Sequence, residues 1–417
     1  MNQKKIIGVV GAGIVGCSCA LWLQKKGFSV ILIDPEKPGS GTSSGNACTI
    51  ADYGCVPVNN PSIFKNLPSL MFAENSPLSV NFGYAMSHLP WMLQFLSNCR
   101  PAKVAHITRT LGELLHKTYE GFDPLIEYCN AESLLSRQGC LYLYRNETEY
   151  QNARAGNQIR RDHGFDFIDV DAGGIRELEP NLKPIFTKGL LFEKATQVIN
   201  PQSLTSRYFE TFLQNGGEYL SQKVSAIGQQ SDQLSIQFDD TENCQVDQLV
   251  IAAGAFAKQI DGIGASKLPL DTERGYHIQY AGKQSLLNRP VCWGTGGFYA
   301  TPTDEGLRFA GTVEIAGYGT GKNPRNIKHL IDHSQQMFDL PEQPGQDWLG
   351  FRPTFPDALP VIGQSLNSER IFYAFGHQHI GLTLSGITGK LIAEMVAGET
   401  LCHDIADFSP RRFIRQN

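Results

Sequence analysis

The sequence lacks the features that mark several classes of protein. Its formal net charge is −5, and no run of basic residues with interleaved aromatics is present, so nucleic acid is not an expected partner. The ten cysteines are scattered, without a CxxC pair or zinc-like spacing. No internal repeat or low-complexity segment is present. We therefore predict a globular, cytoplasmic protein of two or more domains, without a metal site and with mostly buried, reduced thiols.

Long uncharged apolar runs are also scarce. The one that exists, Ile6 to Leu23, follows two lysines and has about the length of a signal peptide or a membrane span. Three regularly spaced glycines inside the run, with a second strand directly after its helix, argue against both interpretations. We predict a soluble chain.

The same stretch has the pattern of a dinucleotide-binding motif. The apolar run Ile6 to Val10 predicts a buried strand, and Gly11, Gly13 and Gly16 follow with G-x-G-x-x-G spacing before a helix that ends near Lys26. The first glycine permits a tight turn, the second lets the backbone approach a pyrophosphate, and the third allows close helix packing.

An acidic residue follows at the expected distance. Asp34 ends the predicted strand Ser29 to Ile33 and is suited to bind a ribose 2′-hydroxyl, while it disfavours the 2′-phosphate of NADP. The next segment, Pro35 to Asn46, is rich in Gly, Ser and Thr, so it is either a ligand-binding loop or an ordinary polar surface loop. Taken alone, this stretch permits NAD or FAD.

The remainder of the chain alternates between helical and strand patterns. Helical patterns occur between 61 and 130, including one from Ile107 to Asp123, and 268–348 is predicted to be a strand-rich insertion. Further strands are predicted at 139–144, 165–170, 248–255, 274–279, 297–302, 307–312 and 371–375, and further helices at 147–161, 175–180, 204–215 and 382–396.

Five motifs occur in a fixed order: GAGIVG with Asp34, TSSGNA, LVIAAGA, WLGFRPTFPDALPVIG and GHQHIGLTLSGITG. With them the chain resembles the FAD-dependent D-amino-acid oxidase superfamily, within it the glycine oxidase and D-amino-acid dehydrogenase branch. The resemblance implies an α/β, Rossmann-like FAD-binding domain formed by residues 1–55, 199–265 and 350–417. It also implies an α+β substrate-binding domain with a discontinuous mixed sheet, formed by 56–198 and 266–349.

The resemblance also implies that FAD is bound non-covalently, and it indicates where the two halves of FAD lie. The adenine half is expected on the glycine motif, and the flavin ring between the loop near 43–47 and the helix start near 376–384, whose N–H groups stabilise negative charge on the reduced ring. The implied cofactor-binding residues are Gly11, Gly13, Ile14, Val15, Gly16, Asp34, Pro35, Thr42, Ser43, Ser44, Asn46, Ala47, Val224, Ala253, Gly254, Gly376, His379, Gly381, Leu382 and Thr383.

Three residues are implied to be catalytic. Arg352 matches the family arginine that binds a substrate carboxylate, although an isolated arginine is more often part of a structural ion pair. Tyr299 matches a tyrosine that hydrogen-bonds the same carboxylate, with a core strand tyrosine as its alternative, and His379 occupies a variable position over the substrate. Weaker candidates are Arg274, His277, Glu314 and His377.

The implied reaction is oxidation of a small D-amino or D-imino acid by hydride transfer from Cα to flavin N5. Oxygen or a membrane quinone is the expected electron acceptor. A quinone acceptor is compatible with peripheral binding of the protein to the inner face of the cytoplasmic membrane. Alternatives are a glycine- or sarcosine-type amine oxidase on the same scaffold, a nicotinamide-dependent dehydrogenase and a non-catalytic FAD-binding subunit.

Overall fold

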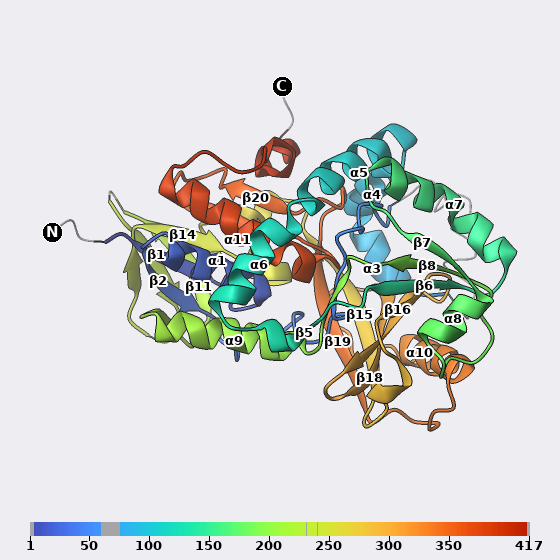
Figure 1. The fold of residues 1–417 in the computed structure, drawn as a ribbon. Coiled ribbons are helices and arrows are strands. Elements are labelled where there is room, and N and C mark those ends of the chain that lie inside the picture. Colours follow the sequence, from blue (N-terminus) through green and yellow to red (C-terminus); the bar gives the residue numbers. More distant parts are fainter. Residues whose placement is uncertain (1–3, 60–75, 231, 240, 415–417) are drawn as a thin grey trace.

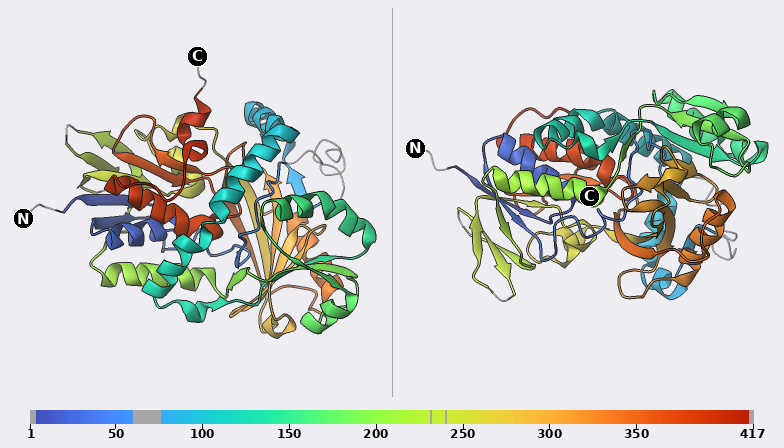
Figure 2. Two further views of the ribbon diagram at one scale, coloured as in Figure 1. Left: turned by 45° about the horizontal axis from the view of Figure 1, so that its top comes forward. Right: turned by 60° about the horizontal axis from the view of Figure 1, so that its bottom comes forward.

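The computed structural model describes residues 4–59, 76–230, 232–239 and 241–414. Figure 1 shows two halves, one around a six-stranded sheet and one around a nine-stranded sheet, and both views in Figure 2 keep them side by side. Of the helical patterns expected from 61 to 130, those in 60–75 lie outside the described residues.

The six-stranded sheet is the nucleotide-type sheet. Three separate segments of the chain supply its strands, which are parallel except for the last. Its edge-to-edge order is β10 (Glu218–Leu220), β2 (Ser29–Ile33), β1 (Ile6–Val10), β14 (Gln248–Ile251), β21 (Ile371–Phe375) and β20 (Val361–Gln364).

Both faces of this sheet are covered, which explains why its central strands are apolar throughout. Val250 of β14 packs on the side of α1 (Ile14–Lys25), α9 (Pro201–Gln214) and α11 (Gly381–Ala397). Its neighbours Leu249 and Ile251 pack on the other side, against a small sheet of β11 (Val224–Gln229), β12 (Leu234–Phe238) and β13 (Cys244–Val246).

The nine-stranded sheet is mixed. Its order is β19 (Gln346–Thr354), β15 (Asp271–Tyr280), β18 (Gly306–Ile315), β17 (Phe298–Thr303), β16 (Val291–Trp293), β6 (Cys140–Tyr144), β8 (Lys188–Phe192) and β7 (Ile168–Asp171), with β4 (Leu78–Val80) also on β18. The β16–β6 and β18–β4 pairs are parallel and the others antiparallel. A short sheet of β3 (Thr49–Ile50), β9 (Thr196–Val198) and β5 (Leu135–Ser136) completes the set. The expected α/β and α+β fold class is confirmed.

The helices differ from the sequence patterns in two places. The single helix expected over 107–123 is two, α5 (Pro101–Leu115) and α6 (Thr118–Tyr128), because the chain turns at 116–117 and directs α6 onto α11. There Gly121 and Gly386 pack so closely that a Cβ on Gly386 would lie 2.5 Å from the Gly121 carbonyl carbon. The second difference is α10 (Pro324–Met337), a helix inside the segment expected to be rich in strands.

The other helices lie beside the nine-stranded sheet (Figure 1). They are α3 (Phe82–Ser87), α4 (Leu89–Asn98), α7 (Glu147–Asp162) and α8 (Ala172–Leu178). The strand expected over 248–255 ends at Ile251, and the 3-10 helix η2 (Gly254–Gln259) follows after Gly254 adopts a φ of 55°.

Three further observations bear on the expectations from composition. All ten cysteines are free, and eight are buried. Among the described residues no group of acidic, histidine and cysteine side chains has the arrangement of a metal site. No helix in the described part of the chain combines the length and apolar character needed to cross a membrane.

Candidate active site

A single cavity of about 1030 Å³ extends from the nucleotide-type sheet to the mixed sheet. Its volume is at the upper end of the range of about 300–1,000 Å³ typical of small-molecule and cofactor sites. Most residues expected at the site line it: Gly11, Gly13, Ile14, Val15, Asp34, Pro35, Thr42, Ser43, Asn46, Ala47, Val224, Ala253, Gly254, Tyr299, Arg352, His379, Gly381 and Leu382.

The β1–α1 turn has the geometry that a pyrophosphate cradle requires. Gly11 has a φ of 105°, and a Cβ there would lie 2.4 Å from the Ala252 carbonyl oxygen. A Cβ on Gly16 would lie 1.8 Å from the Gly11 carbonyl oxygen, so only glycine lets α1 begin this close to β1. The turn therefore fits a dinucleotide such as FAD.

Two side chains fix this turn from outside. Asp34 accepts a hydrogen bond from the Ala12 N–H at 2.6 Å, and Ser43 Oγ accepts one from the Ile14 N–H at 3.0 Å. Burial raises the pKa of Asp34 above its usual value, although hydrogen bonds from two backbone N–H groups oppose this. Asp34 is thus held at the cavity wall beside the glycine turn.

Four of the expected cofactor residues lie behind the wall of the cavity. Ser44 Oγ donates within its own loop, and Thr383 Oγ1 accepts a hydrogen bond from the Ala51 N–H at 3.0 Å. Gly376 has a φ of 87° and packs on Phe355, whose ring a Cβ would approach to 2.3 Å. With Gly16, these residues shape the loops that border the cavity.

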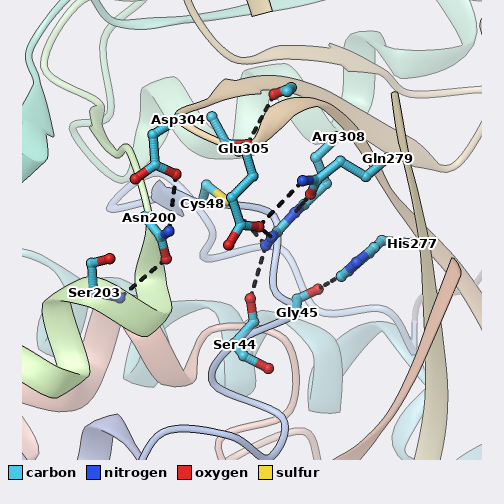
Figure 3. A network of polar contacts seen from close by, with 12 residues as sticks. Ser44, Gly45, Cys48, Asn200, Ser203, His277, Gln279, Asp304, Glu305 and Arg308 are labelled. Atoms are coloured by element: carbon cyan, nitrogen blue, oxygen red, sulfur yellow. Dashed lines mark hydrogen bonds and ion pairs between the residues drawn. The ribbon is translucent and has the colours of Figure 1, made fainter. Parts of the chain in front are cut away.

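A buried arginine that the sequence analysis missed fixes the loop around 44–48 (Figure 3). Arg308 lies on β18, and its Nη1 donates to the carbonyl oxygens of Ser44 at 2.8 Å and Asn46 at 3.3 Å. Its Nε donates to Gln279 on β15 at 3.0 Å. The only sequence signal was a charged residue inside the otherwise apolar strand pattern LRFAG.

His277 supports the same loop and does not line the cavity. Its Nδ1 lies 3.0 Å from the Gly45 carbonyl oxygen (Figure 3), and its ring stacks on Trp348 with centroids 5.0 Å apart. Burial and the nearby charge of Arg308 lower its pKa to about 3, so the ring is neutral at pH 7 and donates to Gly45.

Two other weak candidates pair with each other away from the cavity. Arg274 and Glu314 form a buried ion pair with 3.1 Å between Nη1 and Oε2. Tyr276 donates its hydroxyl to Glu314, and Asn323 donates an amide N–H to the same carboxylate at 2.8 Å. This network ties β15 to β18, and within it the buried Arg274 Nε has no hydrogen-bond partner among the described residues.

Arg352 lies on β19 of the nine-stranded sheet and lines the cavity. Its Nη1 donates to the Thr312 carbonyl oxygen at 2.8 Å and its Nη2 to the Gly311 carbonyl oxygen at 3.3 Å. These bonds use two of its five N–H groups, which leaves donors for a ligand carboxylate. Burial lowers the pKa of Arg352, and the neighbouring Glu273 opposes this.

Tyr299 shares the cavity wall with Tyr142, a second tyrosine that sequence reasoning did not select. Their hydroxyl oxygens are 2.6 Å apart. Burial raises the pKa of both well above the usual value, so both are neutral at pH 7. Because one hydroxyl donates to the other, the pair retains one O–H proton for a ligand.

The loop after β21 brings two histidines to the cavity. Protein atoms surround His379, but its surface is accessible because it faces the cavity. This environment and the charge of Arg352 lower the pKa of His379 to about 4. His377 is buried 3.0 Å from the Thr388 hydroxyl, and burial lowers its pKa to about 3. Both rings are neutral at pH 7.

The wall also contains Glu273, which the sequence analysis did not consider. Its side chain is only 3% exposed, yet it borders the cavity. It is paired with Arg352 in the register of β15 and β19. Burial raises its pKa to about 7, with Arg352 opposing the shift and Asp271 adding to it.

The comparisons with known proteins agree with this geometry. A family model described as "DAO: FAD dependent oxidoreductase" matches residues 7–395. The chain is 31% identical to a D-amino-acid oxidase of Bradyrhizobium diazoefficiens, covering 99% of this chain and all of the relative. It is 25% identical to a D-amino acid dehydrogenase of Dechloromonas aromatica, covering 94% and 96% of the two chains.

A solved structure shares the fold at low identity. The glycine oxidase of Geobacillus kaustophilus superposes with a TM-score of 0.72 at 20% identity, covering 99% of this chain and all of the other. Together with the family match and the cradle for a dinucleotide, this identifies the cofactor as FAD. The chain belongs to the DAO family of FAD-dependent oxidoreductases.

Proposed function

We propose that this protein oxidises a small D-amino or D-imino acid to the corresponding imino acid, which can hydrolyse to the 2-oxo acid. The observation that carries the proposal is that Arg352 and the dinucleotide cradle share one cavity. The D-amino-acid oxidase at 31% identity over the whole chain supports the substrate class. Bound FAD would supply the two-electron acceptor for the hydride of the substrate Cα.

The residues of the chain act mainly by orientation. The free N–H groups of Arg352 bind the substrate carboxylate, and the remaining proton of the Tyr142–Tyr299 pair donates to it. A fixed carboxylate restricts the Cα–H bond to a narrow range of directions, which lowers the entropic part of the barrier. His379 is neutral and borders the site, so it contributes shape and a hydrogen bond to substrate selection.

The two sheets divide this work. We propose the six-stranded sheet and its helices as the FAD-binding unit, since the cradle, Asp34 and the α11 N-terminus all project from it. The positive end of the α11 dipole, at Gly381 and Leu382, borders the cavity and favours negative charge there. The nine-stranded sheet supplies Arg352, Tyr299 and the rest of the substrate wall.

The electron acceptor is oxygen or a membrane quinone. An apolar stripe on α3 and α4 supports membrane contact, since Phe82, Met86, Leu89 and Leu93 recur at helical spacing and are each at least 44% exposed. Oxygen consumption is compared with reduction of a soluble quinone analogue, and sedimentation with anionic vesicles is measured for wild type and Leu93→Ser. If a quinone is the acceptor, the wild type should reduce the quinone analogue faster than it consumes oxygen. Leu93→Ser should then sediment less with the vesicles than the wild type.

The test of the substrate class is an anaerobic screen for bleaching of the flavin absorbance. D-amino acids, D-proline derivatives, glycine and sarcosine are compared with L-amino acids. We expect D-amino or D-imino acids to bleach the flavin fastest. Bleaching by L-amino acids alone would contradict the stereochemical assignment, and bleaching by glycine and sarcosine alone would move the substrate to unbranched amines.

The role of Arg352 has its own test. Arg352→Ala should slow flavin reduction by amino acids about 100-fold or more while FAD stays bound, because a charge-assisted bidentate contact is lost. Arg352→Lys keeps the charge but not the planar fork, so it should recover only part of the rate. Arg137→Ala, which removes an exposed guanidinium, is the matched control. Unchanged reduction in Arg352→Ala would exclude the carboxylate contact.

A further inference from the structure

We propose that Glu273 forms the subsite for the substrate nitrogen: its carboxylate binds the cationic amine and accepts a proton from it before the Cα–H bond breaks. This inference rests on the proposed function and adds a residue to it. Glu273 would thereby select, among small carboxylates, those with a protonated nitrogen on the carbon next to the carboxylate.

The first support is the placement of Glu273 opposite Arg352. The two residues are register partners on the antiparallel strands β15 and β19, and directly paired residues of neighbouring strands point to the same face of a sheet. Both line the cavity. A carboxyl group and a guanidinium therefore occupy one wall of one site.

The second support is that these opposite charges do not neutralise each other by direct contact. The guanidinium of Arg352 turns across β15 above Gly275 and bonds to the Gly311 and Thr312 carbonyl oxygens of β18. No ion pair within 4.0 Å and no hydrogen bond reaches the Glu273 carboxylate from the part of the chain that the structure describes. A buried carboxylate without a partner is costly, and a cationic ligand removes that cost.

The third support is the match with an amino acid zwitterion. The carboxylate and the amine are attached to the same carbon, so a ligand whose carboxylate is on Arg352 presents its nitrogen to the neighbouring part of the wall. Glu273 is the acidic group there, and it suits primary and secondary ammonium groups alike. A 2-hydroxy acid offers Glu273 no cation, so this site should discriminate against it.

The proton balance follows directly. An N–H bond of the substrate breaks and an O–H bond forms on Glu273, which leaves a lone pair on the nitrogen. When the hydride leaves Cα for the flavin, that lone pair forms the C=N bond. The proton on Glu273 returns to solvent after the product departs. The electron pair goes to FAD, so no further reactant is needed.

The electrostatics of the site suit this transfer. Burial raises the pKa of Glu273 to about 7 and makes it a better proton acceptor than an ordinary carboxylate. Arg352 on β19 favours the ionised form of Glu273. Asp271, which lies on β15 like Glu273, disfavours that form. Asp271 itself accepts a hydrogen bond from Tyr84 at 2.6 Å, and His379, from the loop after β21, is neutral near pH 7.

The test is Glu273→Gln, which keeps the shape of the side chain and removes its charge. Two ligand classes are compared on the FAD-loaded protein: D-alanine and D-proline, which carry a cationic nitrogen, and benzoate, which does not. We expect the variant to bind the amino acids about 10- to 100-fold more weakly, the loss of one charge-assisted contact, and to bind benzoate like the wild type. An unchanged flavin absorbance and a thermal unfolding temperature no lower than that of the wild type verify the fold.

A pH profile of flavin reduction provides a second readout. In the wild type the rate at subsaturating amino acid should fall on the acid side as Glu273 becomes protonated, and Glu273→Gln should lose that limb. Glu273→Asp should restore part of both the affinity and the limb. Equal weakening of benzoate and amino acids would instead assign Glu273 to the positioning of Arg352 and overturn the proposal.

Failure of the proposed function has a different signature. In that case no amino acid bleaches the flavin of the wild-type protein, whatever the effect of the Glu273 variants on binding, and both proposals fall. If the wild type is bleached and Glu273→Gln is bleached with the same rate, affinity and pH profile, only the role of Glu273 is contradicted.

Discussion

The guanidinium of Arg352 lies directly over Gly275, where a Cβ atom would come within 2.4 Å of Arg352 Cζ. Gly275 is therefore the residue that lets the arginine cross β15 and reach its acceptors on β18. Gly275→Ala should displace the guanidinium and raise the KM for amino acids about tenfold or more, with FAD still bound, because near-attack geometry is sensitive to shifts of about 1 Å.

The control for this change is Gly319→Ala, where a Cβ would meet open space. Steady-state kinetics and benzoate titration of the two variants measure the effect. Normal benzoate affinity in Gly275→Ala would show that the arginine has another route to its working position.

Removal of Arg308 should loosen the loop that borders the cofactor site. Arg308→Met leaves the carbonyl oxygens of Ser44 and Asn46 and the amide of Gln279 without their buried donor. We expect a loss of about 1–3 kcal/mol in the free energy of unfolding and weaker FAD binding. Denaturant unfolding and quenching of FAD fluorescence measure the two effects. Arg161→Met, which removes an exposed arginine, should change neither.

Asp34 should govern cofactor affinity without touching the substrate site. It holds the Ala12 N–H at the turn and borders the cavity at the nucleotide end. Asp34→Ala should weaken FAD binding about 10- to 100-fold, the value of one or two hydrogen bonds to a charged group. Once FAD is saturating, flavin reduction should recover. Glu210→Gln, which changes an exposed carboxylate on α9 that does not line the cavity, is the control.

How much of the site the sequence predicted depends on how its parts are connected. The glycine turn and Asp34 lie within one strand, helix and strand unit, so spacing alone located them. Arg352 was found through its surrounding motif. Through the pairing of β15 with β19 and β18, which joins segments far apart in the chain, Glu273 reaches the cavity and Arg308 reaches the loop that borders it. No local pattern encodes that register, so neither residue was identified.

The secondary structure shows the same limit. The strands Ile6–Val10 and Ile371–Phe375 were predicted at the bounds that the structure has, because each is a buried apolar run. The break between α5 and α6 was missed, because it depends on the contact of Gly121 with α11. Where local propensity favoured neither state, tertiary contacts determined where the helices begin and end.

Two buried histidines should make the fold sensitive to acid. Burial lowers the pKa of His277 and His377 to about 3, from about 6.5 when unfolded. Below about pH 6.5 the unfolded chain therefore binds two protons that the folded chain does not, so the free energy of unfolding falls as pH falls. Glu273 acts in the opposite direction between about pH 4.3 and 7, because its folded pKa is raised to about 7.

Together, His277, His377 and Glu273 leave one excess proton on the unfolded chain between about pH 4.5 and 6, which contributes a slope of about 1.4 kcal/mol per pH unit. His379, whose pKa is also lowered, to about 4, adds to the slope in the direction of the other two histidines. Denaturant unfolding at several pH values should show that His377→Gln lowers the measured slope by about 1.4 kcal/mol per pH unit and that Glu273→Gln raises it by about the same amount. The two substitutions should change the pH dependence of the free energy of unfolding in opposite directions. Non-specific destabilisation by acid would instead change that pH dependence in the same direction in both variants. A slope that neither substitution alters would mean that these buried groups do not control acid stability.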